Sequence, residues 1–195
     1  MTKTKTKSPE ETKERILNAA RLLFVKKGYF NTSIPDIVQE SGISIGSLYH
    51  HFKNKQYLAK YLYEETMKSV VTELENKIST HANLKDKLKS VVSYILELAD
   101  KNQIKLEYML FIKHEEIQEQ FIPICLSRPF TVVKELLDQG KNAGELNDAP
   151  LDIMAAGFMG IPLKIIEMKI NKVIDYPLES RLDIIFQMCW KSITK

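Results

Sequence analysis

Cysteine is scarce in this chain of 195 residues, which contains only Cys125 and Cys189. Two cysteines so far apart form neither a disulfide framework nor the paired spacing of a structural zinc site. We therefore expect two free thiols in a reducing compartment, which predicts a cytoplasmic protein.

Long apolar runs are also missing. No segment approaches the ~20 apolar residues that a membrane-spanning helix needs, so we expect no contact with a membrane. The first residues alternate threonine with lysine and lack the apolar core of a signal peptide. Residues 1–8 are expected to form a flexible basic tail, with the alternative that the tail lies along phosphates or in a minor groove.

The sequence lacks the patterns of catalytic and metal sites as well. There is no Gly-rich phosphate loop, nucleophile elbow or Ser-His-Asp order. His114 is followed four residues later by Gln118 and not by the second histidine of a zincin. Adjacent His50 and His51 would point about 100° apart on a helix, which does not suit a shared metal. The sequence thus predicts no enzyme, no cofactor and no metal.

What the chain does contain is helical periodicity, without strand-like alternation. A cap and an early proline at Ser8–Glu11 start a first helix, and Gly28 ends it. Ser33–Asp36 is a capping-box pattern for a second helix, which Gly42 closes. A short third helix of residues 44–52 follows after a short turn, and this is helix-turn-helix spacing.

A long fourth helix is predicted from Asn54 to about Ser79, and further helical segments follow to the C-terminus. We therefore expect an all-α fold. A three-helix helix-turn-helix domain of residues 9–57 is joined by the fourth helix to a larger helical domain of residues 58–195.

Charge is distributed unevenly between these domains. Residues 1–55 contain ten Lys or Arg and five Asp or Glu, whereas residues 56–195 contain eighteen and twenty. The positive charge therefore lies in the segment with the helix-turn-helix. This asymmetry suits a protein that meets a polyanion such as DNA with one end.

Three motifs in this segment occur in order at the spacing of a known family. Residues 42–55, Gly-x-Ser-x-Gly-Ser-Leu-Tyr-His-His-Phe-Lys-x-Lys, resemble the recognition helix and following turn of the tetracycline-repressor (TetR) family. Residues 32–37, Thr-Ser-Ile-x-Asp-Ile, resemble its second helix. Residues 19–29, with Ala-Ala, Leu-Phe and Gly-Tyr, resemble its first. The resemblance covers roughly residues 12–62, and it implies a ligand-binding and dimerisation role for the larger domain.

The resemblance also implies a set of DNA-binding residues, in which small side chains let the third helix approach base edges and hydroxyl, imidazole and ammonium groups hold phosphates. Base reading is expected from Ile45, Gly46 and Ser47, and phosphate contacts from Ser33, Ser44, Tyr49, His50 and Lys55. Either His50 or His51 is expected to support packing or a phosphate contact. Many relatives have a polar residue where this chain has Ile45. An apolar side chain packs on a thymine methyl, so we expect an A·T-rich half-site there.

A small apolar effector is expected in the second domain, because its helices carry many aromatic and Met residues and the resemblance implies a cavity there. The alternative is that each of these residues belongs to an ordinary core. A set without charged groups suits a neutral or weakly polar ligand. The residues expected to line the cavity are Tyr61, Met67, Tyr94, Met109, Phe121 and Phe158.

The last two helices, residues 149–172 and a final helix from Leu178, are more apolar than one core requires. They predict a homodimer through a four-helix packing, with a monomer as the alternative. The combined prediction is a ligand-responsive transcriptional regulator, a repressor, that binds a palindromic double-stranded DNA operator as a homodimer and is released by the effector. Two alternatives are a DNA-binding regulator controlled by a protein partner and an enzyme or ligand carrier that retains a helix-turn-helix module.

Overall fold

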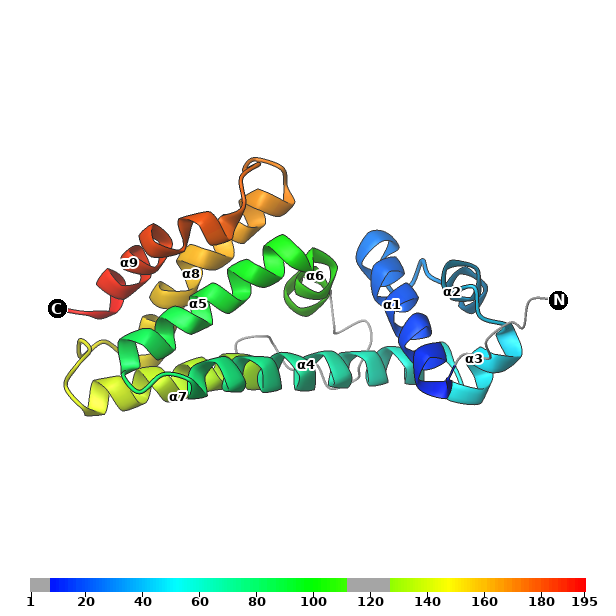
Figure 1. Cartoon of the computed structure of the whole chain (residues 1–195), viewed down its shortest axis with the longest axis horizontal. Helices are drawn as coiled ribbons and strands as arrows, with labels where there is room; N and C mark the ends of the chain where they lie inside the picture. The colour runs from blue at the N-terminus through cyan, green and yellow to red at the C-terminus, as the bar shows by residue number, and fades with distance from the viewer. Residues whose placement is uncertain (1–7, 112–126) are drawn as a thin grey trace. The chain divides into compact units, whose positions relative to one another are not determined.

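The computed structural model of the chain describes residues 8–111 and 127–195. Residues 1–7 of the expected tail and Phe121 of the expected cavity lie outside this described part. In order along the chain, its elements are α1 (Pro9–Lys27), α2 (Ile34–Ser41), α3 (Ile45–His51), α4 (Lys55–Ser79), α5 (Leu84–Lys101), α6 (Gln103–Phe111), α7 (Arg128–Asn142), α8 (Leu151–Ile170), the 3-10 helix η3 (Leu178–Arg181) and α9 (Leu182–Ile193) (Figure 1). Within the described ranges there is no strand, and the all-α prediction is confirmed.

The first three helices begin and end where their local sequence predicts. Ser8 and Glu11 form a reciprocal capping box at α1, with N···O distances of 2.9 and 3.1 Å. Ser33 and Asp36 form the same arrangement at α2. Gly42 then adopts the left-handed conformation, with φ 62°, which a residue without Cβ does at little cost. These contacts satisfy orphan N–H and C=O groups locally, so neighbouring residues are enough to specify the helix ends.

The chain divides into two compact units. The first comprises residues 1–66 with 107–122, and the second comprises residues 67–106 with 123–195. Both α4 and α6 contribute residues to each unit. The sequence-based domain boundary after residue 57 follows the helix-turn-helix motif, whereas packing extends the first unit further along α4.

Helix α3 packs on the hydrophobic core of the first unit. Leu48 and Phe52, one turn apart, are almost completely buried and pack with residues of α1, α2 and α4. Tyr108 of α6 joins the same core, and its hydroxyl donates to the carbonyl oxygen of Ala59 at 3.5 Å. The burial of these two residues thus fixes which face of α3 remains exposed.

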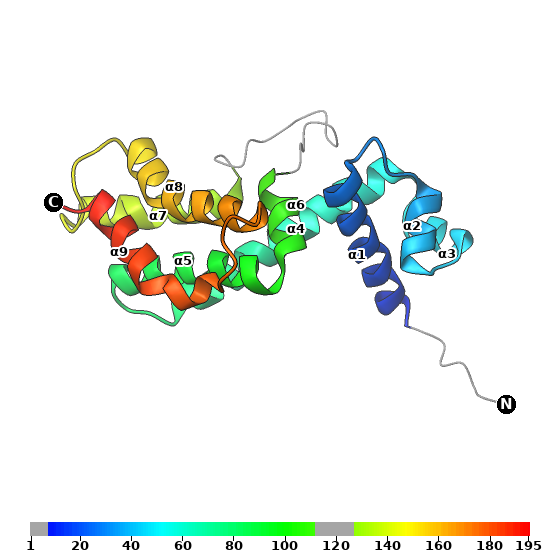
Figure 2. The same cartoon turned by 90° about the horizontal axis from the view of Figure 1, so that it is seen from above.

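In the second unit, α8 and α9 lie side by side and antiparallel in both views (Figure 1, Figure 2). A polar clasp fixes the turn between them. Asp100 of α5 accepts from the Glu179 N–H at 2.9 Å and pairs with Lys169 at 3.1 Å, while Lys169 also donates to the carbonyl of Tyr176. Burial alone would raise the pKa of the Asp100 carboxyl, but these contacts outweigh it and hold that pKa below its usual value. The clasp lies at η3. The sequence predicted that the final helix begins here, at Leu178, whereas α9 begins at Leu182.

No helix in the described ranges is both long enough and apolar enough to cross a membrane.

Candidate nucleic-acid interface

Helix α3 presents a surface of unusual composition for its length of seven residues. Ser44 caps it by accepting from the Ser47 N–H at 3.2 Å. Ile45 and Tyr49 lie on its outer face with 51% and 50% of their surface exposed, although both are large apolar side chains. Apolar side chains left in water over a well-packed core are a common mark of a binding surface.

Gly46 lies between these two residues in the sequence, and a Cβ added there would meet no atom of the described residues within 4 Å. Its φ is not in the left-handed region, so neither its conformation nor its described neighbours require glycine. Glycine lowers the stability of a helix interior by roughly 0.5–1 kcal/mol relative to alanine. The exposed glycine leaves the backbone of α3 uncovered on this face.

The remaining residues of the expected set differ in how free they are. Ser44 and His50 are exposed, whereas Ser47 and His51 are half-buried. The Ser33 hydroxyl donates to Asp36 Oδ2 at 2.6 Å and accepts from the Asp36 N–H at 3.2 Å. Ser33 therefore has a capping role in the free protein.

Lys55 is another expected phosphate contact that forms hydrogen bonds within the protein. Its Nζ lies 3.0 Å from the carbonyl oxygens of both Tyr29 and Thr32. The ammonium also lies 4.2 Å from the centre of the Tyr29 ring. Burial lowers the pKa of Lys55. The structure thus gives this residue an internal task that its position in the motif does not reveal.

Arg15 is a further cation that binds a main-chain carbonyl of the protein, and this role was not predicted from the sequence. Its guanidinium donates to the carbonyl of Ser41, the last residue of α2, and lies 3.0 Å from the position of a Cβ on Gly42. Arg15 therefore holds the turn of the helix-turn-helix from α1. The contact spans 26 residues of sequence, and no local pattern indicates it.

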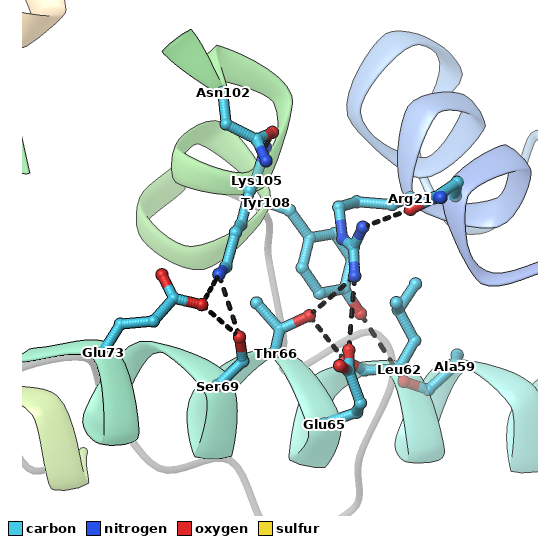
Figure 3. Close-up of polar contacts among 11 residues, drawn as sticks. Arg21, Ala59, Leu62, Glu65, Thr66, Ser69, Glu73, Asn102, Lys105 and Tyr108 are labelled. Carbon is cyan, nitrogen blue, oxygen red and sulfur yellow. Dashed lines mark hydrogen bonds and ion pairs between the residues drawn. The ribbon is translucent and has the colours of Figure 1, made fainter. Parts of the chain in front are cut away.

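Other cations of the basic segment bind carboxylate or hydroxyl groups of the protein itself. Arg21 of α1 lies 3.3 Å from Glu65 and 3.4 Å from the Thr66 hydroxyl on α4 (Figure 3). Burial is the main cause that lowers the pKa of the Arg21 guanidinium. Lys27 pairs with Asp36 at 3.5 Å. The excess positive charge of this segment therefore overstates the charge that is available for phosphates.

The second unit contains a separate buried polar group. Lys105 lies 2.7 Å from Glu73 and 3.0 Å from the Ser69 hydroxyl (Figure 3). The Tyr94 hydroxyl donates to the other oxygen of Glu73 at 2.8 Å, and burial together with this carboxylate raises the pKa of Tyr94. Tyr94, expected to line the cavity, thus completes an ion-pair network, and it also lines a hollow of about 310 Å³ between α4 and α5.

The other described residues of the expected cavity are divided between the two units. In the first unit, Tyr61 packs on Phe52 with ring centroids 5.6 Å apart, and Met109 is buried. Met67 and Phe158 are buried in the second unit. The packing of these side chains agrees with the alternative of an ordinary core, and their role as ligand contacts remains a prediction.

Comparisons with known proteins agree with this architecture. Residues 16–62 match the family model described as bacterial regulatory proteins, tetR family. The chain is 26% identical over 158 residues to the transposon Tn10 TetC protein of Escherichia coli, which covers 79% of this chain and 80% of that protein. It is also 26% identical over 144 residues to the fatty acid metabolism regulator protein of Bacillus subtilis, covering 73% of this chain and 74% of that one.

Solved structures share the fold over nearly the whole chain. The fatty acid degradation regulator FadR of Bacillus halodurans superposes with a TM-score of 0.78 at 20% identity, covering 95% of this chain and 97% of its own. FadR of Bacillus subtilis in complex with stearoyl-CoA superposes with a TM-score of 0.70 at 20% identity, covering 92% and 98%.

Proposed function

Because the chain belongs to the TetR family of transcriptional regulators, we propose that it is a repressor that binds a palindromic operator as a homodimer and releases it on binding an effector. The observation that carries the DNA-binding part is the outer face of α3, where exposed Ile45 and Tyr49 flank a glycine that the fold does not need. The fatty acid metabolism regulator protein and other relatives are named as regulators, which supports a protein that is not an enzyme.

The proposed DNA contacts follow from the exposure of the residues. Ile45, Gly46 and Ser47 lie on the first turn of α3 and would read bases. Ser44, Tyr49 and His50 are exposed around that turn and would hold phosphates, together with Ser33 at the start of α2. His51 is half-buried and would support the helix.

Exposed apolar side chains on α8 and α9, here called the α8–α9 stripe, support the homodimer. Ile153 and Ile184 are 61% and 60% exposed, and Met188 is 53% exposed one turn after Ile184. On α8, a Cβ added to Gly160 would meet no atom of the described residues within 4 Å. Apolar and small side chains on two adjacent helices suit close packing against the same two helices of a second copy.

For the effector we propose a small apolar molecule, and a long acyl chain is the first class to test. Two relatives support this choice, since one is named a fatty acid metabolism regulator and another was solved with stearoyl-CoA. The expected contacts remain Tyr61, Met67, Tyr94, Met109, Phe121 and Phe158. The second candidate, control by a protein partner, predicts that no such molecule alters DNA binding.

Selection of binding sites from a random duplex library tests the DNA-binding function. We expect a palindrome whose half-sites have A·T pairs opposite Ile45, because an apolar side chain packs on the thymine methyl and cannot form the bidentate bonds that read guanine. The variant Ile45→Arg should select G·C at the same position, with discrimination of about 1–3 kcal/mol. If the natural protein selected an invariant G·C pair there, and Ile45→Arg left it unchanged, Ile45 would not read that base.

Titration with stearoyl-CoA, with and without the selected duplex, tests the effector. If the sites are linked, DNA must weaken effector binding by the factor by which the effector weakens DNA binding, typically ~1–3 kcal/mol of coupling. Half-buried Trp190, whose ring lies 6.1 Å from that of Phe186 on α9, provides a fluorescence signal. Coenzyme A without the acyl chain is the control. Equal dissociation constants in the two titrations would show that an occupied pocket does not control DNA binding.

A further inference from the structure

Lys55, the first residue of α4, lies in a cup formed by the loop between α1 and α2. The Tyr29 and Thr32 carbonyl oxygens each lie 3.0 Å from its Nζ, and the Tyr29 ring lies beneath it at 4.2 Å. An ammonium has three N–H donors, so two are directed at main-chain oxygens and the ring adds a cation–π contact. The protein itself therefore orients this cation before DNA arrives.

Hydrogen bonds and ring packing within residues 24–32 hold the cup in place. The Thr32 hydroxyl donates to the Gly28 carbonyl at 2.9 Å, and its N–H donates to the Tyr29 carbonyl at 3.2 Å. Tyr29 packs on Phe24 with ring centroids 5.5 Å apart. The two carbonyls thus converge on one point. Without the ammonium the Thr32 carbonyl would lose this donor and the Tyr29 carbonyl would keep the Thr32 N–H, so the loop would lose two charge-assisted hydrogen bonds.

The cup connects the parts of the unit that we propose to touch DNA. Thr32 directly precedes Ser33, the N-cap of α2. Lys55 itself follows the C-cap of α3, Phe52, by three residues. The side chain of Lys55 therefore ties the end of the recognition helix to the start of α2, so that both ends of the motif share one anchor.

Its neighbour Lys53 provides a contrast. Lys53 is exposed, and its Nζ lies 5.5 Å above the Tyr57 ring. Lys55 is half-buried, and burial lowers the pKa of its ammonium. A phosphate-neutralising lysine is expected to resemble Lys53, with a hydrated and mobile charge, whereas Lys55 is packed as part of the structure.

We propose that Lys55 is a positioning residue, which acts on DNA binding by fixing residues 28–33 against the start of α4 and thereby setting the N-terminus of α2 relative to α3, rather than by neutralising a phosphate. This inference rests on the proposed DNA-binding function. It assigns to Lys55 a role different from the phosphate contact that its place in the motif implies.

The test compares Lys55→Met, Lys55→Arg and the control Lys53→Met, which removes the same charge close by. The probe is a duplex that the wild-type protein selects from a random library, and Kd is measured over a series of salt concentrations well below the Tm of each variant. We expect Lys55→Met to weaken binding about tenfold or more at every salt concentration, as loss of charge-assisted hydrogen bonds implies. The slope of log K against log salt should equal that of the wild-type protein.

Two further readouts separate positioning from other roles. Lys55→Arg should not restore affinity, because a planar guanidinium does not fit a cup shaped for an ammonium. In the free protein, the Asp36 and Ile37 amides, which both donate to Ser33, should exchange hydrogen faster in Lys55→Met and be unchanged in Lys53→Met.

The inference is overturned if Lys55→Met lowers the slope by about one unit relative to the wild-type protein and Lys55→Arg restores affinity, because that pattern identifies a phosphate contact. It is also overturned if Lys55→Met lowers only Tm and leaves the affinity of the folded protein unchanged. If the wild-type protein selects no duplex, the proposed function fails, while the exchange experiment still decides whether Lys55 anchors the loop.

Discussion

Replacing Gly46 by alanine should stabilise the free protein and weaken its binding to DNA. A Cβ at this position meets no atom of the described residues within 4 Å, so the fold accommodates it. Alanine is better than glycine in a helix by roughly 0.8–1.0 kcal/mol, which for a chain of this size raises Tm by about 2–4 °C. If the backbone of α3 approaches base edges, the same methyl group overpacks the interface at a cost of about 1–3 kcal/mol, or roughly a 5- to 150-fold rise in Kd.

A size series at this position serves as its own control. Gly46→Ser and Gly46→Leu should weaken binding to the selected duplex in order of side-chain volume, while Tm does not fall in the same order. Thermal unfolding and binding isotherms on the same preparations give both quantities. Affinity that is independent of side-chain size would show that DNA does not contact α3 at Gly46.

The opposite signs of these effects distinguish a binding surface from a core position. Replacing a glycine in the core lowers the stability of the fold. Gly140 is such a position, because its added Cβ would lie 2.2 Å from Leu84 and 2.8 Å from Leu146. Gly46 has no such neighbours in the described part of the chain. The size series therefore tests whether the backbone of α3 is contacted by DNA at Gly46.

The sequence predicted those features of the fold that depend on nearby residues. The caps at Ser8, Ser33 and Ser44 each bond to an N–H three residues ahead, so a short motif is enough to locate the helix starts. Leu48 and Phe52 share the inward face of α3 because they are spaced by one helical turn.

Contacts between distant segments were not predictable in this way. Arg15 reaches Ser41 and Lys55 reaches Tyr29 across 26 residues each, and no periodicity in the sequence marks either pair. Both lysine and arginine in a basic segment suggest phosphate contacts by residue type alone. Only the folded arrangement shows that these two cations bind main-chain carbonyls.

The expected cavity shows a related limit. Tyr94 and Phe158 were grouped because aromatic residues on helices suit an apolar pocket. In the structure Phe158 is fully buried, whereas the Tyr94 hydroxyl completes the Lys105–Glu73 network. Residue type does not distinguish a pocket wall from a core, because both require large apolar side chains.

A negative charge on the α8–α9 stripe should convert the proposed homodimer into folded monomers. Ile153 and Ile184 are each about three-fifths exposed in the single chain, with values of 61% and 60%, so aspartate at either position is hydrated in the monomer and costs the fold little. In a two-fold interface each substitution occurs twice, and an unpaired buried charge costs several kcal/mol. Since each 1.4 kcal/mol is tenfold, we expect Ile153→Asp and Ile184→Asp each to weaken the dimer at least a hundredfold.

Sedimentation velocity over a range of concentrations measures this effect directly, and circular dichroism checks that the monomers keep their helices. Phe30→Asp is the matched control, because Phe30 is 70% exposed and lies in the other unit. It should leave the dimer intact. The monomeric variants should also lose most of their affinity for the full palindrome while retaining weak binding to a half-site, because two recognition helices must dock together on a two-fold operator. A dimer that survives both stripe substitutions would place the interface on another surface.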